Sequence, residues 1–296
     1  MDDSRSIELR QAYADHNRRW QDFLYCYPVI SRRSKGLSVG INLNPDKACN
    51  FDCIYCQVDR STPGLVRKVD LHLVRSELAG LLDAAISTSL FRDSPFSALP
   101  NDQRVVRDIA FSGDGEPTTF PHFAEAVRLV ADLKSDRRLH DTKIVLITDA
   151  CYLTRPDVAA GLRTMDENNG EIWAKLDAGT QEYYEQVNRP NFPLSHVLAQ
   201  IREAAVLRPI VIQSLWMRIH GAPPPDEEVA AFAARLQAIQ SAGGKLKLVQ
   251  IYTIARHTAE KYASPLSPPE LDNVASIVRQ SIDTPLETYY GVEKST

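Results

Sequence analysis

The stretch that decides the fold is Cys49-Asn50-Phe51-Asp52-Cys53-Ile54-Tyr55-Cys56, in which three and then two residues separate successive cysteines. Thiolates are the ligands that iron–sulfur clusters favour in proteins. Three thiolates on one short loop hold three irons of a cubane and leave the fourth iron open to a small molecule, as catalytic metal sites do. The spacing therefore predicts a [4Fe-4S] cluster on Cys49, Cys53 and Cys56.

Two other interpretations of the three cysteines are a structural zinc site completed by a distant histidine, and three unrelated buried thiols. Zinc ligands usually occur as two separated pairs, and no histidine lies within twelve residues of these cysteines. The spacing favours the iron–sulfur cluster over both.

The whole chain has the composition of a folded protein, which we expect in the cytoplasm. It has 296 residues, 44% of them hydrophobic, and its 34 basic and 38 acidic side chains give a net charge of -4. This balance is not typical of a nucleic-acid binder. The N-terminus is polar, and no segment approaches the roughly 20 apolar residues that span a bilayer, so we expect no membrane association. An odd number of cysteines favours metal ligation over disulfides.

Short apolar runs alternate with helical periods after residue 36, which is typical of βα units and a parallel sheet. The expected strands are 37–43, 108–111, 143–148, 171–176, 210–217 and 246–254. Six such units predict an α/β fold, a partial (β/α)6 TIM-like barrel with its active site at the C-terminal ends of the strands. We expect a helical extension over 1–28, the barrel over 29–283 and a tail over 284–296.

Polar side chains and glycines follow the predicted strands, where they would face the mouth of the barrel and bind a cofactor or substrate. They are Ser112, Gly113, Asp114, Gly115 and Glu116 after the second strand, Thr148 and Asp149 after the third, Lys175 and Asp177 around the end of the fourth, and Gln213 in the fifth. Three alternatives remain open: a simple turn at the glycines, helix capping by Thr148 and Asp149, and a buried ion pair between Lys175 and Asp177.

The cysteine loop, with the aromatic Tyr55 just before its last cysteine, resembles the cluster-binding motif of the radical S-adenosylmethionine (SAM) superfamily. The resemblance implies that the open iron chelates the amino and carboxylate groups of SAM and that Tyr55 lies near the adenine. An electron from the reduced cluster then breaks a sulfur–carbon bond and releases a 5'-deoxyadenosyl radical. It also implies a reducing partner such as flavodoxin or ferredoxin. The segment from Ser112 to Glu116 resembles the glycine-glycine-glutamate segment that contacts the SAM amino group.

Within the superfamily, the chain resembles the wyosine-synthesis-like Fe-S oxidoreductases. The likeness rests on residues 28–41, 112–118, 175–178 and 252–256. True wyosine synthases modify guanosine in tRNA and carry further cysteines for a second cluster, whereas this chain has only Cys26 and Cys151 to spare. A tRNA-modifying activity is therefore an alternative that we do not favour.

The basic residues that such a tRNA-binding patch would use are equally expected on a solvated charged face. They are Arg18, Arg19, Arg32, Arg33, Lys35, Arg67 and Lys68.

Candidate catalytic residues follow the later strands and would face the substrate, which the sequence does not identify. They are Tyr252, Arg256 and Cys151, joined by His257, His220 and Arg218. Arg256 has the fork geometry that binds anionic groups, and Cys151 is either a hydrogen-atom donor or an inert buried thiol. The sequence thus predicts a radical SAM oxidoreductase or transferase. The alternative of another class is a non-catalytic protein that binds an Fe-S cluster or zinc.

Overall fold

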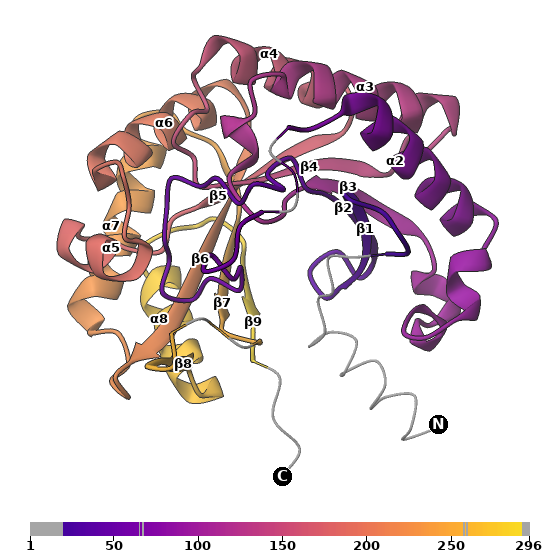
Figure 1. Cartoon of the computed structure of the whole chain (residues 1–296). Helices are drawn as coiled ribbons and strands as arrows, with labels where there is room; N and C mark the ends of the chain where they lie inside the picture. The colour runs from indigo at the N-terminus through magenta and orange to yellow at the C-terminus, as the bar shows by residue number, and fades with distance from the viewer. Residues whose placement is uncertain (1–19, 65, 67, 257, 259, 292–296) are drawn as a thin grey trace. The chain divides into compact units, whose positions relative to one another are not determined.

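The computed structural model describes residues 20–291 except 65, 67, 257 and 259 (Figure 1). These residues form two compact units that alternate along the chain. Among the described residues, the first unit takes its residues from 20–48, 63–146 and 157–171, and the second from 49–62, 147–156 and 172–291. The cysteine loop belongs to the second unit.

The first unit is built on an antiparallel pair followed by parallel strands. β1 (Cys26–Ser31) pairs antiparallel with β2 (Gly36–Ile41), and β2, β3 (Val106–Phe111) and β4 (Lys143–Thr148) are parallel neighbours. The helices of this unit are α2 (Leu71–Ile86), α3 (Phe123–Asp136) and most of α4 (Pro156–Asp166). Short 3-10 helices cover Ser89–Arg92, Phe96–Ala98, Asn101–Gln103 and Pro117–Thr119. α2 packs against β1 and α3.

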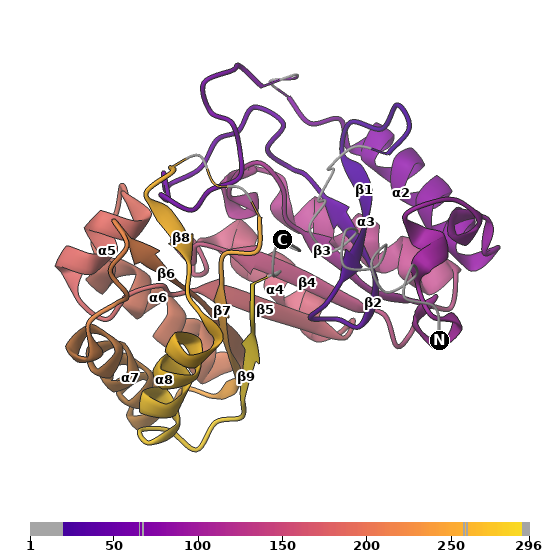
Figure 2. The ribbon, with the colours of Figure 1, turned by 90° about the horizontal axis from the view of Figure 1, so that it is seen from below.

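The second unit carries the later strands and four helices. β5 (Gly170–Lys175), β6 (Ile210–Ile219), β7 (Leu246–Thr253) and β9 (Leu286–Tyr289) are parallel, and β8 (Ala263–Pro265) pairs antiparallel with β6. The helices are α5 (Gln181–Asn188), α6 (Leu194–Leu207), α7 (Asp226–Ser241) and α8 (Pro268–Arg279). α7 packs against α6 and α8, and Figure 2 shows α7 and α8 side by side near β7 and β9.

The strand order agrees with the βα units expected from the sequence. It runs β1-β2-β3-β4-β5-β6-β7-β9. The six predicted strands correspond to β2 through β7, with ends that differ by a few residues. In α2, Val74, Leu78 and Leu81 recur at helical spacing and are buried.

Three short strands were not predicted. β1 lies at the end of the strand order and contains Pro28, which lacks the N–H of an inner strand and is tolerated at an edge. β8 has only three residues. β9 lies within the segment expected to be a tail, and its residues 286–289 pair with β7. Most of the expected N-terminal helical extension, residues 1–19, lies outside the described residues, and the division at 29 and 283 stays a prediction.

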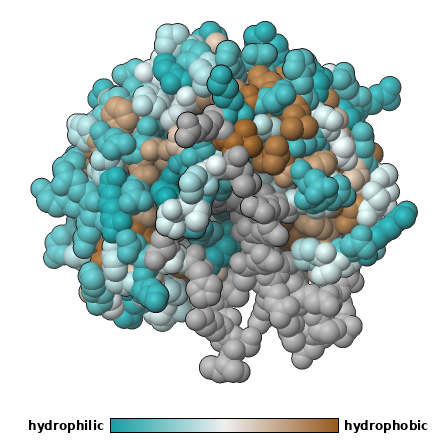
Figure 3. Space-filling model, in the orientation of Figure 1, coloured by the Kyte–Doolittle hydropathy of each residue, from teal (hydrophilic) through white to brown (hydrophobic). Residues whose placement is uncertain are grey.

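The surface carries mixed character. The face shown in Figure 3 is largely hydrophilic, and hydrophobic residues gather in part of it. Isolated exposed apolar side chains such as Leu207, which is 73% exposed, are normal in folded proteins. Among the described residues, no helix combines the length and the hydropathy that crossing a bilayer requires.

A buried carboxylate fixes the start of β1 onto α2 in the first unit. Glu77 is 4% exposed, and it accepts hydrogen bonds from the backbone N–H groups of Leu24 (2.9 Å), Tyr25 (2.9 Å) and Cys26 (3.0 Å). Tyr25 and Cys26 are buried as well, so their N–H groups cannot bond to water instead. One side chain thus satisfies the donors where the chain enters the sheet.

We expect Glu77→Ala to lower the free energy of unfolding by about 2–4 kcal/mol, because each buried donor left without an acceptor costs about 1–3 kcal/mol. Urea unfolding followed by circular dichroism measures the loss. Glu125→Ala, on the exposed side of α3, is the matched control and should change stability by about 0.5 kcal/mol or less. Equal losses in the two variants would show that Glu77 does not hold β1.

Candidate cofactor site

The cysteine loop is anchored by the residues between its cysteines. The backbone N–H groups of Asp52 and Ile54 donate to the carbonyl oxygens of Asn188 (3.1 Å) and Val187 (3.0 Å). Ile54 is 1% exposed and belongs to the apolar cluster that contains Val187 and Leu215. The loop is therefore fixed along the end of α5 by hydrogen bonds and by hydrophobic burial.

The three cysteines themselves stay accessible. Cys49, Cys53 and Cys56 are each partly exposed, and none forms a disulfide. The Nδ2 amide of Asn188 donates to Cys53 Sγ at 3.4 Å, and Nη2 of Arg60 donates to Cys56 Sγ at 3.8 Å. Partly exposed thiols that receive N–H donors have the surroundings of metal ligands rather than of core residues.

The donor set was tested against the expected cluster. In the described part of the chain, no group of three or more His, Cys, Asp or Glu side chains is arranged to hold a metal ion. The loop nevertheless supplies three cysteines outside any disulfide within eight residues, which is the number and type of ligand that a site-open [4Fe-4S] cluster requires. The donor chemistry fits the cluster, and the cluster itself belongs to the proposal below.

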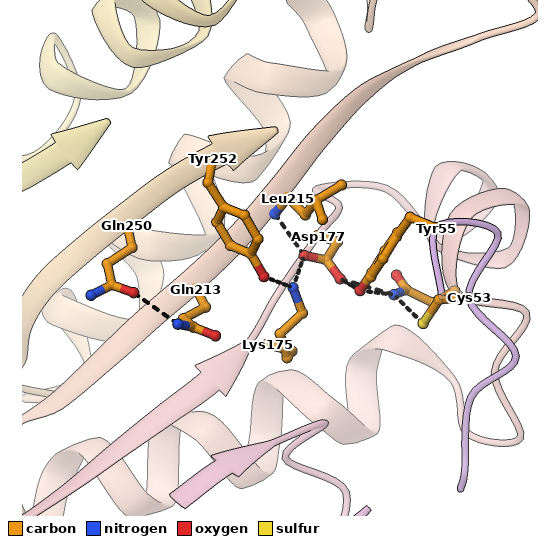
Figure 4. Close-up of polar contacts among 9 residues, drawn as sticks. Cys53, Tyr55, Lys175, Asp177, Gln213, Leu215, Gln250 and Tyr252 are labelled. Atoms are coloured by element: carbon orange, nitrogen blue, oxygen red, sulfur yellow. Dashed lines mark hydrogen bonds and ion pairs between the residues drawn. The ribbon is translucent and has the colours of Figure 1, made fainter. Parts of the chain in front are cut away.

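Asp177 is the centre of the polar network beside this loop (Figure 4). Its side chain is fully buried, and it accepts hydrogen bonds from Lys175 Nζ (2.9 Å), Leu215 N (2.8 Å), Asn188 Nδ2 (3.0 Å) and the Tyr55 hydroxyl. These donors come from β5, β6, the end of α5 and the cysteine loop. The network therefore ties the loop to the strand ends of the second unit.

Lys175 is held between two tyrosines. Its Nζ donates to the Tyr252 hydroxyl at 2.6 Å and lies 5.1 Å from the Tyr55 ring centre and 4.8 Å from that of Tyr252. Burial lowers the pKa of Lys175, but Asp177 and Tyr252 raise it by more, and the net shift is upward. Lys175 is therefore an ammonium ion, stabilised by its carboxylate partner and by the two aromatic rings.

The predicted residues after β4 bond mainly to their own turn. Thr148 Oγ1 accepts from Ala150 N at 3.0 Å, and Asp149 Oδ1 accepts from Cys151 N at 2.9 Å. Both bonds close a turn rather than cap a helix, because α4 begins only at Pro156. Asp149 has a further contact, because its Oδ2 accepts from Asn50 Nδ2 of the cysteine loop at 2.8 Å. Cys151 is 1% exposed, which agrees with a buried thiol.

Gln213 forms a buried amide pair. Its Nε2 donates to Gln250 Oε1 at 2.8 Å, and the two residues are 1% and 3% exposed. They lie on neighbouring strands, β6 and β7, in the same view as Lys175 and Tyr252 (Figure 4). Sequence reasoning identified Gln213 but not its partner.

The glycine-rich segment after β3 belongs to the first unit and makes its own contacts there. Ser112 Oγ lies 3.1 Å from the Tyr27 hydroxyl, and Asp114 Oδ2 accepts from Asn42 Nδ2 at 2.8 Å. Glu116 caps the short helix that follows it by accepting from Thr118 N.

Two glycines of this segment are required by their surroundings. A Cβ at Gly113 would lie 2.5 Å from Oδ1 of Asn42, and one at Gly115 would overlap the carbonyl oxygen of Ala48, the residue before Cys49. The glycines therefore allow a close approach of two chain segments rather than only a turn.

The substrate-side candidates are placed unevenly. Tyr252 joins the Lys175 network, and Arg256 is partly exposed after β7. Arg218 forms an ion pair with Glu270, with Nε at 3.1 Å from Oε2, and His220 stacks on Tyr262, so both have structural partners. His257, Arg18, Arg19 and Arg67 lie outside the described residues, and the basic patch stays a prediction.

No family model matches the chain. The UPF0026 protein of Methanocaldococcus jannaschii is 29% identical over 179 residues, which are 60% of this chain and 47% of that protein. The UPF0026 protein of Helicobacter pylori is 27% identical over 164 residues, 55% of this chain and 45% of that protein. The chain thus spans about half the length of these curated relatives.

Two solved structures resemble the chain over most of its length. Streptococcus suis SuiB bound to S-adenosylmethionine gives a TM-score of 0.58 at 10% identity, covering 87% of this chain and 52% of SuiB. TYW1 with a lysine-pyruvate adduct gives 0.54 at 11% identity, covering 93% of this chain and 81% of TYW1. At such identities the likeness shows the fold alone. It confirms the α/β partial barrel expected from the sequence.

Sequence reasoning missed four polar residues of the site: Asn50, Arg60, Asn188 and Gln250. Asn50 lies inside the cysteine motif, so its position was a usable signal. Asn188 ends α5, and its contacts to Cys53 and Asp177 arise only when the chain folds. No spacing in the sequence indicates them.

The contacts of Asp177 and Lys175 predict that removing one charge or the other lowers the free energy of unfolding by different amounts. We expect Asp177→Asn to lower the free energy of unfolding by about 3–5 kcal/mol, because it leaves the buried ammonium of Lys175 without a counter-charge. Lys175→Met should cost less, about 1–3 kcal/mol, because Asp177 keeps the donors from Tyr55, Asn188 and Leu215.

Urea unfolding of the two single variants and the double variant measures both losses and their coupling. Asp283→Asn, at an exposed position of the same unit, is the control. Equal losses of unfolding free energy in Lys175→Met and Asp177→Asn would show that the other hydrogen-bond donors do not stabilise the Asp177 carboxylate once Lys175 is gone.

Proposed function

We propose that this chain is a radical SAM enzyme that binds a [4Fe-4S] cluster on Cys49, Cys53 and Cys56 and cleaves SAM reductively to modify an unidentified substrate. The observation that carries the proposal is the construction of the cysteine loop. Its intervening residues are anchored to the end of α5, while its three cysteines are partly exposed and form no disulfide. The likeness in fold to SuiB, which was solved with SAM bound, supports the same assignment.

The chemistry needs one electron, and a reducing protein such as flavodoxin or ferredoxin is the proposed source. Cys49, Cys53 and Cys56 would hold the [4Fe-4S] cluster, which would supply the one-electron reduction that cleaves SAM. The protein's own residues must then orient SAM and keep water away from the radical. The buried apolar cluster around Ile54 and Leu215 is suited to the second task.

The polar residues at the strand ends are the proposed SAM and substrate ligands. Tyr55 donates to Asp177, and burial, followed by Asp177, raises the pKa of its phenol, so Tyr55 stays neutral and offers an aromatic face to an adenine. Asp177 and Gln213 offer oxygens to ribose hydroxyls. Thr148 and Asp149 are proposed for the same role, although their described bonds are to the backbone and to Asn50.

The segment from Ser112 to Glu116 is the proposed partner of the SAM amino group, because its carboxylates and backbone carbonyls are acceptors. Tyr252, Arg256 and Cys151 remain the proposed residues on the substrate side. Of these, Tyr252 has the described contact that favours a role, its hydrogen bond to Lys175.

Lys175 is assigned the binding of an anionic group. The TYW1 structure holds a lysine-pyruvate adduct, and a lysine must lose its proton before it can attack a carbonyl carbon. The pKa of Lys175 is raised, because Asp177 and Tyr252 outweigh the effect of burial. An ammonium ion in this position favours a carboxylate of SAM or of the substrate, and disfavours an adduct.

The decisive experiment is anaerobic reconstitution with iron and sulfide followed by reduction with dithionite in the presence of SAM. We expect about four irons per chain, the absorption of a [4Fe-4S] cluster, and 5'-deoxyadenosine in the wild-type reaction. Cys53→Ala should lose both the cluster and the product. Cys26→Ala, which removes a buried thiol of the first unit, should keep both.

Two results would contradict the proposal. One is a cluster that forms but never changes its electron paramagnetic resonance spectrum when SAM is added, which is the behaviour of an electron carrier with four protein ligands. The other is one tightly bound zinc that Cys53→Ala releases, which is the behaviour of a structural site.

A further inference from the structure

Two side-chain N–H donors outside the cysteine motif point at two of its thiols. Asn188 Nδ2 lies 3.4 Å from Cys53 Sγ, and Arg60 Nη2 lies 3.8 Å from Cys56 Sγ. Asn188 is 1% exposed and ends α5, while Arg60 follows the loop in the chain and its side chain is 26% exposed. One donor is neutral and buried, and the other is a cation near the surface.

The carboxamide of Asn188 is oriented by Asp177. Its Nδ2 lies 3.0 Å from Asp177 Oδ2, so the opposite orientation would place an amide oxygen against a carboxylate oxygen. The amide nitrogen must therefore face Asp177, and its N–H groups are shared among that carboxylate, Cys53 and the Tyr55 hydroxyl, which lies 3.5 Å away. The amide oxygen is buried and has no partner among the described residues. A buried unsatisfied oxygen costs stability, so this arrangement is not explained by stability alone.

Arg60 contacts both Asp52 and Cys56, whereas the described contacts of Arg189 include Asp52 but no motif cysteine. Arg60 Nε lies 3.9 Å from Asp52 Oδ1, and Arg189 Nη1 lies 3.4 Å from Asp52 Oδ2. Asp52 is 60% exposed on its side chain, so both pairs are surface ion pairs that contribute little to stability. Arg60 additionally donates to a motif cysteine, whereas the described partners of Arg189 are Asp52, Glu260 and Tyr262.

We propose that Asn188 and Arg60 raise the reduction potential of the cluster through N–H···S hydrogen bonds to Cys53 and Cys56. This inference rests on the proposed function. Reduction adds one electron, and therefore one negative charge, to the cluster and its thiolates. Donors aimed at those thiolates stabilise the more negative, reduced form, which makes the potential less negative. The two residues are positioning and tuning residues for electron transfer rather than groups that touch the substrate.

The chain offers a matched control for each donor. Asn50 is a buried asparagine of the same loop that donates to Asp149 Oδ2 at 2.8 Å, as Asn188 donates to Asp177, but its described bond does not reach a sulfur. Asn188→Leu and Asn50→Leu therefore each remove one amide–carboxylate bond, and only the first removes an N–H···S bond. Arg60→Met and Arg189→Met form the second pair, since each removes one cation beside Asp52.

The test is a redox titration of the four reconstituted, SAM-free variants and the wild type, with the signal of the reduced cluster followed by electron paramagnetic resonance. We expect the midpoint potentials of Asn188→Leu and Arg60→Met to be more negative than that of the wild type. The potentials of Asn50→Leu and Arg189→Met should stay close to it. Iron and sulfide contents and melting temperatures check that every variant is folded and loaded.

Equal shifts within a pair would overturn the proposal, because loss of a charge or disturbance of the loop would then be the cause. Unshifted potentials in Asn188→Leu and Arg60→Met would overturn it too. If Asn188→Leu does not fold, Asn188→Ala removes the same donor without branching, and the arginine pair tests the proposal independently at Cys56. A wild type that never binds a cluster refutes the proposed function, whereas one that cleaves SAM with unchanged variant potentials refutes only this inference.

Discussion

The Asp177 carboxylate is fully buried, and a buried charge persists only when it is paired and hydrogen-bonded. That requirement brings together parts of the second unit that are distant in the chain. Lys175 supplies the counter-charge from β5, Leu215 supplies a backbone N–H from β6, and Tyr55 and Asn188 supply donors from the cysteine loop and the end of α5. Each of these segments is constrained by the same two oxygens, which act together with the backbone hydrogen bonds and the burial of Ile54 that hold the loop against α5.

In the cysteine loop, the residues that anchor the loop are not the cysteines that we propose as metal ligands. Phe51 and Ile54 are 6% and 1% exposed, whereas the three cysteines are partly exposed. The backbone between the cysteines donates to the end of α5, which fixes the path of the loop without using a thiol. The backbone of such a loop keeps its path without a bound metal, and the sulfurs can serve as metal ligands.

The sequence specified most of the sheet and about half of this network. Apolar runs located β2 through β7 because buried parallel strands need continuous apolar residues. β1 was not predicted because a proline usually interrupts a strand. Pro28 lies in an edge strand, where its missing N–H does not lower stability. Tyr55, Lys175 and Asp177 were found because the ends of parallel strands and the cysteine motif are informative positions. Asn188 was not found, since its hydrogen bonds depend on the folded path of a loop about 135 residues away, and no local pattern encodes them.

Two expectations for Lys175 and Asp177, a buried ion pair and a ligand-binding pair, need not exclude each other. An ammonium ion has three N–H donors, and the described contacts of Lys175 use two acceptors, Asp177 and the Tyr252 hydroxyl. The two buried charges therefore compensate each other, and one N–H donor of Lys175 is left for an anionic oxygen. A neutral ligand would not repay the burial of such a pair, whereas a carboxylate would gain a charge-assisted bond in a poorly solvated place. The geometry thus favours an anionic ligand for Lys175, even though the side chains of the surrounding cluster are apolar. The physical reason is the one that holds Asp177 in place: a buried charge is stable only when it is paired.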